Sequence, residues 1–163
     1  MMKRRTFMQV VTGALVACGL RPAGRAEAID LSADTEKLLT EAEEIDVATR
    51  RKSGKRSSAA PIWFLFHEGD IYTTTAPGSW KAKRIANGSP MYIWVGSQDG
   101  PFFIGEPEVI DDPKLIDWMG EQYNEKYWIA WLGFFRPRSE RVTGGQTIAY
   151  RVKLSEGEPP PAA

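Results

Sequence analysis

The chain has 163 residues, of which 42% are hydrophobic and 26% charged, so it has the composition of a folded protein and the length of one domain plus a targeting segment. The formal net charge is zero, but residues 1–28 hold five of the 21 basic residues and one of the 21 acidic residues, which leaves the remainder with a net charge of −4. A mildly acidic domain gives no sequence-wide case for binding nucleic acid or anionic membranes, and a chain with one Cys and one His can form neither an internal disulfide nor the usual zinc clusters.

Residues 1–28 have the three parts of an export signal. The pair Arg4-Arg5 precedes an apolar run at 10–20, and a polar segment follows that ends in Ala26-Glu27-Ala28. As a helix the run would be roughly 16 Å long, well short of the roughly 30 Å hydrocarbon core of a bilayer. The arginine pair and the weak hydrophobicity of the run predict a twin-arginine signal. We therefore expect the twin-arginine machinery to export the folded protein to the periplasm or another extracytoplasmic space.

Two processing sites compete within this segment. Ala26-x-Ala28 predicts cleavage before Ile29 and a soluble product, whereas Leu15-Val16-Ala17-Cys18 resembles a lipobox in which Cys18 carries a lipid anchor. We favour cleavage after Ala28. A basic N-terminal helix of a cytosolic protein is the remaining interpretation of the same residues.

The rest of the chain is expected to form one β-rich domain at 44–154, between a polar helix or linker at 29–43 and a Pro-rich, disordered tail at 155–163. Ser32 is placed to cap the first helix, and Asp112-Pro113 opens a longer one that runs to about Trp128. Apolar alternation and turn residues predict strands at 45–49, 60–66, 71–75, 91–95, 102–107 and 147–154. About six short strands with one substantial helix favour a mainly β (α+β) fold, a small antiparallel barrel.

Between the third and fourth of these strands, hydroxyl groups lead into a cluster of cations. Thr75 ends the strand, and Ser79 precedes Lys81, Lys83 and Arg84. If this segment is helical, Lys81 and Arg84 share a face because they are three residues apart. A phosphate group binds to such a combination of free N–H groups, a hydroxyl and basic side chains. A solvated basic face is an equally common result of this pattern, so both interpretations stay open at this point.

From Ile45 to Leu154 the chain resembles the pyridoxamine 5'-phosphate oxidase-like family, the FMN-binding split β-barrels. The motifs that carry the resemblance occur in the family's order: Ala48-Thr49-Arg50-Arg51, Ala60-Pro61-Ile62-Trp63-Phe64, Ile71 to Thr75, Ser79-x-Lys81 with Lys83-Arg84-Ile85, Ser89-Pro90-Met91 and Lys126-Tyr127. The similarity covers about 110 residues, and each motif alone is loose.

The resemblance implies a flavin-type cofactor, FMN or a related deazaflavin, bound between the subunits of a homodimer. It implies phosphate binding by Ser79, Lys81 and Arg84, with Lys83 as an alternative cation. It also implies contact with the flavin ring by Trp63, Thr74 and Thr75. Oxidation of pyridoxamine phosphate itself is doubtful, because no His follows the late helix and the chain has no C-terminal substrate-binding strand.

Three functions remain possible at this stage. The first is an exported flavin- or deazaflavin-dependent oxidoreductase whose substrate and electron donor the residues do not specify. The second is a non-catalytic barrel that binds a flavin, haem or another planar ligand. The third is a barrel that serves only dimerisation or partner binding. The cationic segment favours the first two.

Other candidate residues have plainer explanations. His67 lies in an expected hairpin turn beside Glu68, and Asp111-Asp112 is better explained as a helix cap than as a metal site. The remaining candidates fall late in the chain: the aromatic residues Trp128, Trp131, Phe134 and Phe135, which we expect in the core or a dimer interface, and the basic residues Arg136, Arg138 and Arg141, which we expect in a solvated loop.

Overall fold

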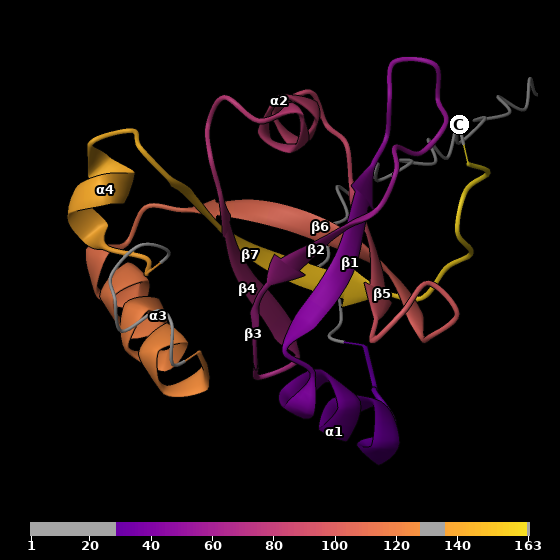
Figure 1. The fold of residues 1–163 in the computed structure, drawn as a ribbon, viewed down its shortest axis with the longest axis horizontal. Coiled ribbons are helices and arrows are strands. Elements are labelled where there is room, and N and C mark those ends of the chain that lie inside the picture. Colours follow the sequence, from indigo (N-terminus) through magenta and orange to yellow (C-terminus); the bar gives the residue numbers. More distant parts are fainter. Residues whose placement is uncertain (1–28, 128–135, 163) are drawn as a thin grey trace, which may run out of the picture.

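The computed structural model describes residues 29–127 and 136–162 (Figure 1). The expected signal at 1–28, with its cleavage and lipidation sites, and the aromatic segment from Trp128 to Phe135 lie outside the described residues. The elements follow the chain in the order α1 (Ala33–Glu41), β1 (Glu44–Thr49), β2 (Ala60–Trp63), β3 (Leu65–His67), β4 (Asp70–Thr75), α2 (Trp80–Ala86), β5 (Met91–Val95), β6 (Phe102–Ile110), α3 (Pro113–Lys126), α4 (Ser139–Thr143) and β7 (Ile148–Ser155).

The seven strands form one antiparallel sheet in the order β2-β1-β5-β6-β7-β4-β3. The two edge strands, β2 and β3, are consecutive in the chain and are separated only by Phe64. Because one short segment supplies both edges, it closes the sheet on itself into a nearly complete barrel. The expected small antiparallel split barrel is confirmed.

The closing segment differs from the expectation in one respect. The apolar run predicted a single strand at 60–66, whereas the structure interrupts it at Phe64. The backbone N–H of Phe64 donates to the Tyr127 hydroxyl (3.0 Å), and its carbonyl accepts from Lys126 Nζ (3.2 Å). Side chains from the end of α3 therefore replace the ladder partners that a continuous strand would have needed.

We refer to this junction as the Phe64 seam, formed by Trp63, Phe64, Thr73, Tyr123, Lys126 and Tyr127. The carbonyl of Trp63 accepts from Thr73 Oγ1 at 2.9 Å and from the Tyr123 hydroxyl at 3.1 Å. The Tyr127 hydroxyl also lies 2.6 Å from the Glu43 carbonyl and 2.8 Å from the Phe64 carbonyl. The seam thus gives each of these backbone groups a side-chain partner.

The interior of the barrel is filled by alternate residues of the strands, as the period-two patterns predicted. Ile45, Ile71, Ile93 and Val152 are each at most 1% exposed. A second cluster lies between the sheet and α3, where Met119 and Tyr123 of the helix meet Tyr72 and Ala149 of the strands. Figure 1 shows α3 and α4 grouped at one side of the barrel and α2 over one end.

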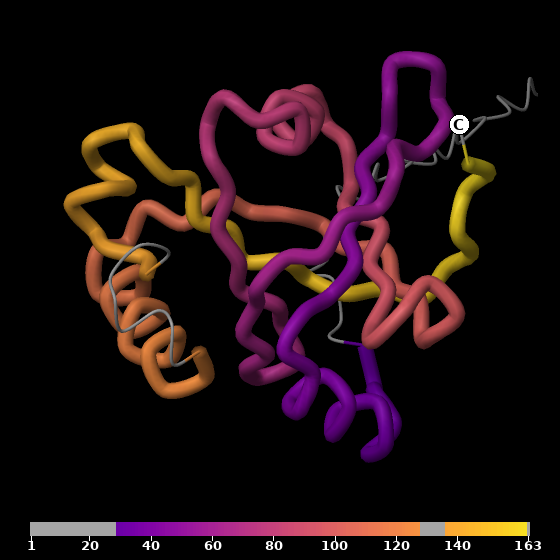
Figure 2. The backbone as a smooth tube through the Cα atoms, in the orientation of Figure 1, coloured from indigo at the N-terminus to yellow at the C-terminus, as the bar shows by residue number. Residues whose placement is uncertain are grey.

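The segment after β7 returns towards the loop between β1 and β2 (Figure 2). The backbone N–H of Arg56 in that loop donates to the Pro161 carbonyl at 3.3 Å, and Gly157 packs closely against Ile104. The Arg56 guanidinium lies 5.0 Å from the centre of the Trp94 ring on the outer face of the sheet. The last described residues therefore contact the base of the loop that carries Arg50 and Arg51.

Candidate functional site

A pocket of about 470 Å³ lies between α2 and the loop that follows β1. Its lining residues are Arg50, Arg51, Lys52 and Gly54 from the loop and Trp80, Lys83, Arg84, Asn87 and Ser89 from α2 and the turn after it. Five of these nine residues are cations and none is an acid. We refer to it as the cationic pocket.

Hydrogen bonds fix the loop side of this pocket to the turn after α2. The Arg50 N–H donates to Ser89 Oγ (2.7 Å), and Arg50 Nη2 donates to the Gly88 carbonyl (2.8 Å). From the helix, Arg84 Nη1 donates to Thr49 Oγ1 at 3.3 Å. The two walls are therefore held together by contacts that leave Arg51, Lys52 and Lys83 exposed at the surface.

No acidic side chain among the described residues neutralises the charges in the cationic pocket. Within residues 29–127 and 136–162, none of the five cations forms an ion pair with a carboxylate. Cations gathered in a hollow raise the local concentration of anions, and Arg and Lys side chains form charge-assisted hydrogen bonds with phosphate oxygens. The arrangement suits a ligand with more than one negative charge.

A second pocket, of about 300 Å³, lies beside the Phe64 seam. Its lining residues are Glu44, Pro61, Ile62, Trp63, Thr74 and Tyr123. The Trp63 ring stacks on Tyr127 with ring centres 4.5 Å apart and an interplanar angle of 6°. Burial raises the pKa of Tyr123, the neighbouring Tyr127 adds to the rise, and the hydrogen bond with Thr73 opposes it. Tyr123 is therefore a neutral phenol at physiological pH.

The predicted hydroxyl residues Thr75 and Ser79 lie at the end of β4 and just before α2. Ser79 is the N-cap of α2, and its Oγ accepts from the Ala82 N–H at 3.0 Å. Its Oγ also lies 3.3 Å from Thr75 Oγ1. Because the Ser79 Oγ caps the helix as an acceptor, its O–H proton can be donated either to Thr75 Oγ1 or to an anion.

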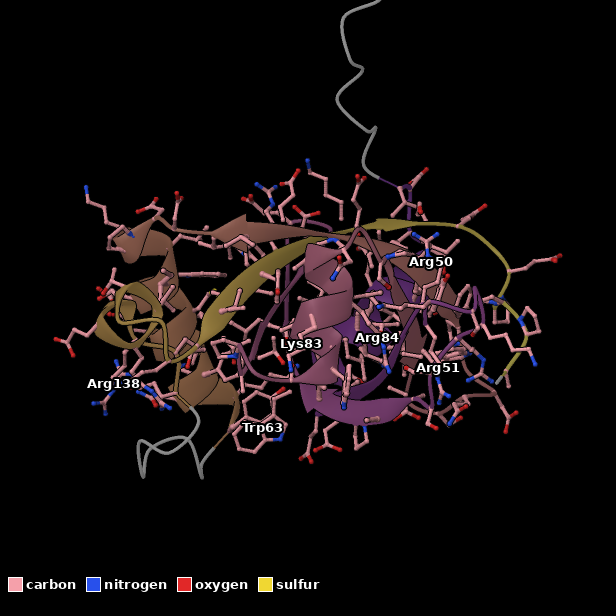
Figure 3. All side chains as sticks on the ribbon, turned by 90° about the horizontal axis from the view of Figure 1, so that it is seen from above. Arg50, Arg51, Trp63, Lys83, Arg84 and Arg138 are labelled. Carbon is pink, nitrogen blue, oxygen red and sulfur yellow. The ribbon has the colours of Figure 1, made fainter. Side chains whose placement is uncertain are left out.

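The structure divides the predicted site residues into three groups. Lys83 and Arg84 line the cationic pocket, and Trp63 and Thr74 line the second pocket. Thr75, Ser79 and Lys81 line neither of these two pockets, and burial lowers the pKa of Lys81 to about 8. In Figure 3 the labelled side chains follow one another from Trp63 through Lys83 and Arg84 to Arg51.

The sequence interpretation missed half of the cationic pocket. Arg50 and Arg51 were noted only within a motif that carries the family resemblance, and Lys52 and Trp80 were given no role. The available signal was three consecutive cations directly after a strand, the first two of them within a motif already noted for its resemblance. That signal does not show which segment forms the other side of the pocket, because Ser89, which binds the loop, is 39 residues away from Arg50.

The plainer candidates stay outside both pockets. His67 is exposed, with Nε2 3.8 Å from a Glu68 carboxylate oxygen, and Asp112 caps α3 by accepting from the Lys114 N–H. Arg138, at the start of α4, lies far from the labelled cations of the pocket in Figure 3. In the described part of the chain, no cluster of three His, Cys, Asp or Glu side chains could hold a metal, and no helix is long and apolar enough to cross a membrane.

No family model matches this sequence, and no curated protein matches it. Solved structures do match the fold. An F420 reductase shares 18% identity and a TM-score of 0.53, with 74% of this chain and 93% of that chain covered. A putative pyridoxamine 5'-phosphate oxidase from Listeria innocua shares 12% identity and a TM-score of 0.55, with 76% and 92% covered. An FAD and heme binding protein from Mycobacterium smegmatis shares 22% identity and a TM-score of 0.51, with 79% and 73% covered. At these identities the similarity shows a shared split-barrel fold.

Proposed function

We propose that this protein binds a flavin-type cofactor, FMN or a deazaflavin, and acts as an oxidoreductase. The observation that carries the proposal is the cationic pocket, in which five cations have no acidic partner among the described residues. A flavin-type cofactor carries a phosphate joined to a planar ring. The cations fit the phosphate, and the aromatic pocket at Trp63 fits the ring.

In this arrangement the protein supplies binding and orientation. Arg51, Lys83 and Arg84 would hold the phosphate, and the rigid Trp63–Tyr127 stack would form one wall for the ring. When bound, the cofactor supplies the electron or hydride transfer, so the protein needs no acid or base of its own for the redox step. The F420 reductase and the FAD and heme binding protein among the matched structures support a ligand of this class.

A haem-binding barrel is the alternative within the same fold, and it is less well supported by the described residues. Haem iron is held by an axial ligand, most often His, Cys, Met or Tyr. His67 is the only His in the chain, it is exposed, and it lines neither pocket. The hydroxyl of Tyr123 in the second pocket is already bonded to the Trp63 carbonyl.

The test is a titration of the protein with FMN and with a deazaflavin, followed by fluorescence. Exchanging Arg51 and Lys83 together for Ala removes two exposed cations whose side chains donate no hydrogen bond to another described residue. Each charge-assisted bond contributes about 1.5–3 kcal/mol, so we expect affinity to fall at least about tenfold.

A matched control replaces two exposed lysines away from the pocket, Lys37 and Lys114, with Ala. This variant should bind as the unmodified protein does, and circular dichroism should show both variants folded. Equal affinities of the two double variants would place the phosphate elsewhere, and no binding by the unmodified protein would refute the flavin proposal.

We further propose that the protein is exported by the twin-arginine route and forms a homodimer. The first rests on Arg4-Arg5 and the second on the resemblance to flavin-binding split barrels. Replacing both arginines with Lys should retain the precursor in the cytoplasm, and mass spectrometry of the mature N-terminus separates a start at Ile29 from a lipidated Cys18. Light scattering of the purified protein should give twice the mass of one chain.

A further inference from the structure

Trp80, the first residue of α2, is an unusually exposed aromatic side chain. It is 72% exposed, the highest value among the large hydrophobic side chains of the described residues, where Val109 is 66% and Leu38 37% exposed. An indole ring normally buries most of its large apolar surface. α2 packs on the barrel through Ala82 and Ile85, so Trp80 contributes little to the core.

The position of this ring relates it to the cationic pocket. Trp80 lines the pocket, with Lys83 Nζ 5.1 Å and Arg84 Cζ 5.8 Å from the ring centre. These distances are within the range of cation–π contacts, which orient the indole beside the charges. The pocket therefore offers a planar apolar surface directly next to several cations.

The size of the pocket exceeds the needs of a single phosphate group. Its volume of about 470 Å³ falls within the roughly 300–1,000 Å³ typical of sites for whole small molecules. A ligand with several carboxylates would bind the cations but leave the indole exposed to water. A purine nucleoside diphosphate would use both, since its base can stack on the indole while its two phosphates bind the cations.

One more group in the pocket suits a purine. The Asn87 side-chain nitrogen donates to the Lys83 carbonyl at 2.6 Å, which assigns its amide orientation and leaves the amide oxygen as an acceptor. The exocyclic amino group of adenine is a donor that this oxygen can accept. Inorganic phosphate and pyrophosphate have no amino group.

We propose that the cationic pocket binds an adenosine diphosphate group, with adenine on Trp80 and the diphosphate among Arg51, Lys83 and Arg84. For a flavin, this inference rests on the proposed function: the flavin that binds would then be a dinucleotide of the FAD type. Free ADP has the same chemistry, so the experiment must separate the two sources.

The experiment titrates the purified protein with ADP, pyrophosphate, FAD and FMN by calorimetry, and repeats each titration with Trp80→Ala and Trp80→Phe. Stacking of a base on an aromatic side chain is strong enough that its loss to Ala should weaken ADP and FAD binding by about fivefold or more. Trp80→Phe should retain most of the affinity. Pyrophosphate should bind all three proteins equally, and FAD should bind the unmodified protein at least about fivefold more tightly than FMN.

Each outcome bears on a different statement. Unchanged ADP and FAD affinities in Trp80→Ala would overturn the inference, as would an equal loss of affinity for pyrophosphate. A change only in the oligomeric state would also overturn it, because it would assign Trp80 to a subunit interface. FMN binding without ADP binding overturns the inference and keeps the flavin proposal. Trp80-dependent ADP binding, with no binding of FAD, FMN or the deazaflavin of the earlier titration, keeps the nucleotide site and refutes the flavin proposal.

Discussion

The polar groups of the Phe64 seam have protein partners, whereas the cations of the cationic pocket have no acidic partner among the described residues. At the seam, the carbonyls of Trp63 and Phe64 and the Phe64 N–H all have side-chain partners from β4 or α3. In the cationic pocket, five charged side chains lack an acidic partner among the described residues and four of them are exposed. A buried network in which every polar group has a hydrogen-bond partner stabilises a fold, whereas unpaired cations in a pocket favour the binding of an anionic ligand. Substitutions in the two regions should therefore separate stability from binding.

The largest loss of stability should come from Phe64→Ala. Phe64 is fully buried and its ring lies 3.9 Å from Lys126 Nζ. Truncating a buried Phe to Ala costs about 3–5 kcal/mol because it leaves a cavity, and here the cavity would open where the barrel closes. Chemical denaturation measures the loss. Anion binding per folded molecule should not change, and a specific loss of binding in the folded fraction would contradict the separation of the two regions.

Tyr127→Phe should cost less, about 1–3 kcal/mol, and it tests the polar part of the seam alone. The variant keeps the ring stacked on Trp63 but deletes the hydroxyl that accepts from the Phe64 N–H. A buried N–H without a partner costs about that amount. The free energy of unfolding is again the readout, with Tyr92→Phe as a control because Tyr92 is buried without a hydroxyl hydrogen bond of this kind. Equal effects of the two variants would show that the hydroxyl bonds of the seam contribute little.

The sequence predicted the barrel better than the way in which it closes. Alternation along 45–49, 71–75 and 147–154 identified the strands, because that pattern depends on residues that are neighbours in the chain. The break at Phe64 depends on Tyr127, 63 residues later. Nothing local in the uninterrupted apolar run marks such a partner, so a continuous strand was the natural prediction.

The site shows the same division. Lys83 and Arg84 were predicted as site residues, since Ser79 and the cations lie together in the chain, and the structure places them on a helix. The opposite wall was not, because Arg50 reaches the pocket through bonds with Gly88 and Ser89 that only the folded chain creates. The exposure of Trp80 is likewise a property of the tertiary structure.

Lys126 should make the stability of the seam depend on pH. Burial lowers the pKa of Lys126 to about 8, and nearby Glu43 opposes this. Between pH 8 and 10 the unfolded chain therefore binds a proton that the folded Lys126 has released, so stability should rise with pH. Lys81, whose pKa burial also lowers to about 8, should act in the same direction.

The rise is checked by measuring unfolding free energies from pH 7 to about 11 for the unmodified protein, Lys126→Met, Lys81→Met and the double variant. Each variant should lose part of the rise, and the double variant most of it. Above pH 10 the raised pKa of Tyr127, about 12 because of burial, should reverse the trend, since the unfolded phenol ionises first. A flat difference between Lys126→Met and the unmodified protein over pH 8–10 would refute a buried ammonium at the seam.

The smallest effect on stability should come from the double variant Arg51→Ala/Lys83→Ala. Both side chains are exposed and neither is paired with an acid among the described residues, so their loss removes no stabilising ion pair. It does remove repulsion among the five cations of the pocket. We expect the free energy of unfolding to stay within about 0.5 kcal/mol of the original or to rise slightly, and any rise to shrink at high salt, where like charges are screened. Denaturation at low and high salt measures both quantities. A clear loss of stability would show that these cations hold the loop and α2 together, and the comparison between a stabilising seam and a binding pocket would then fail.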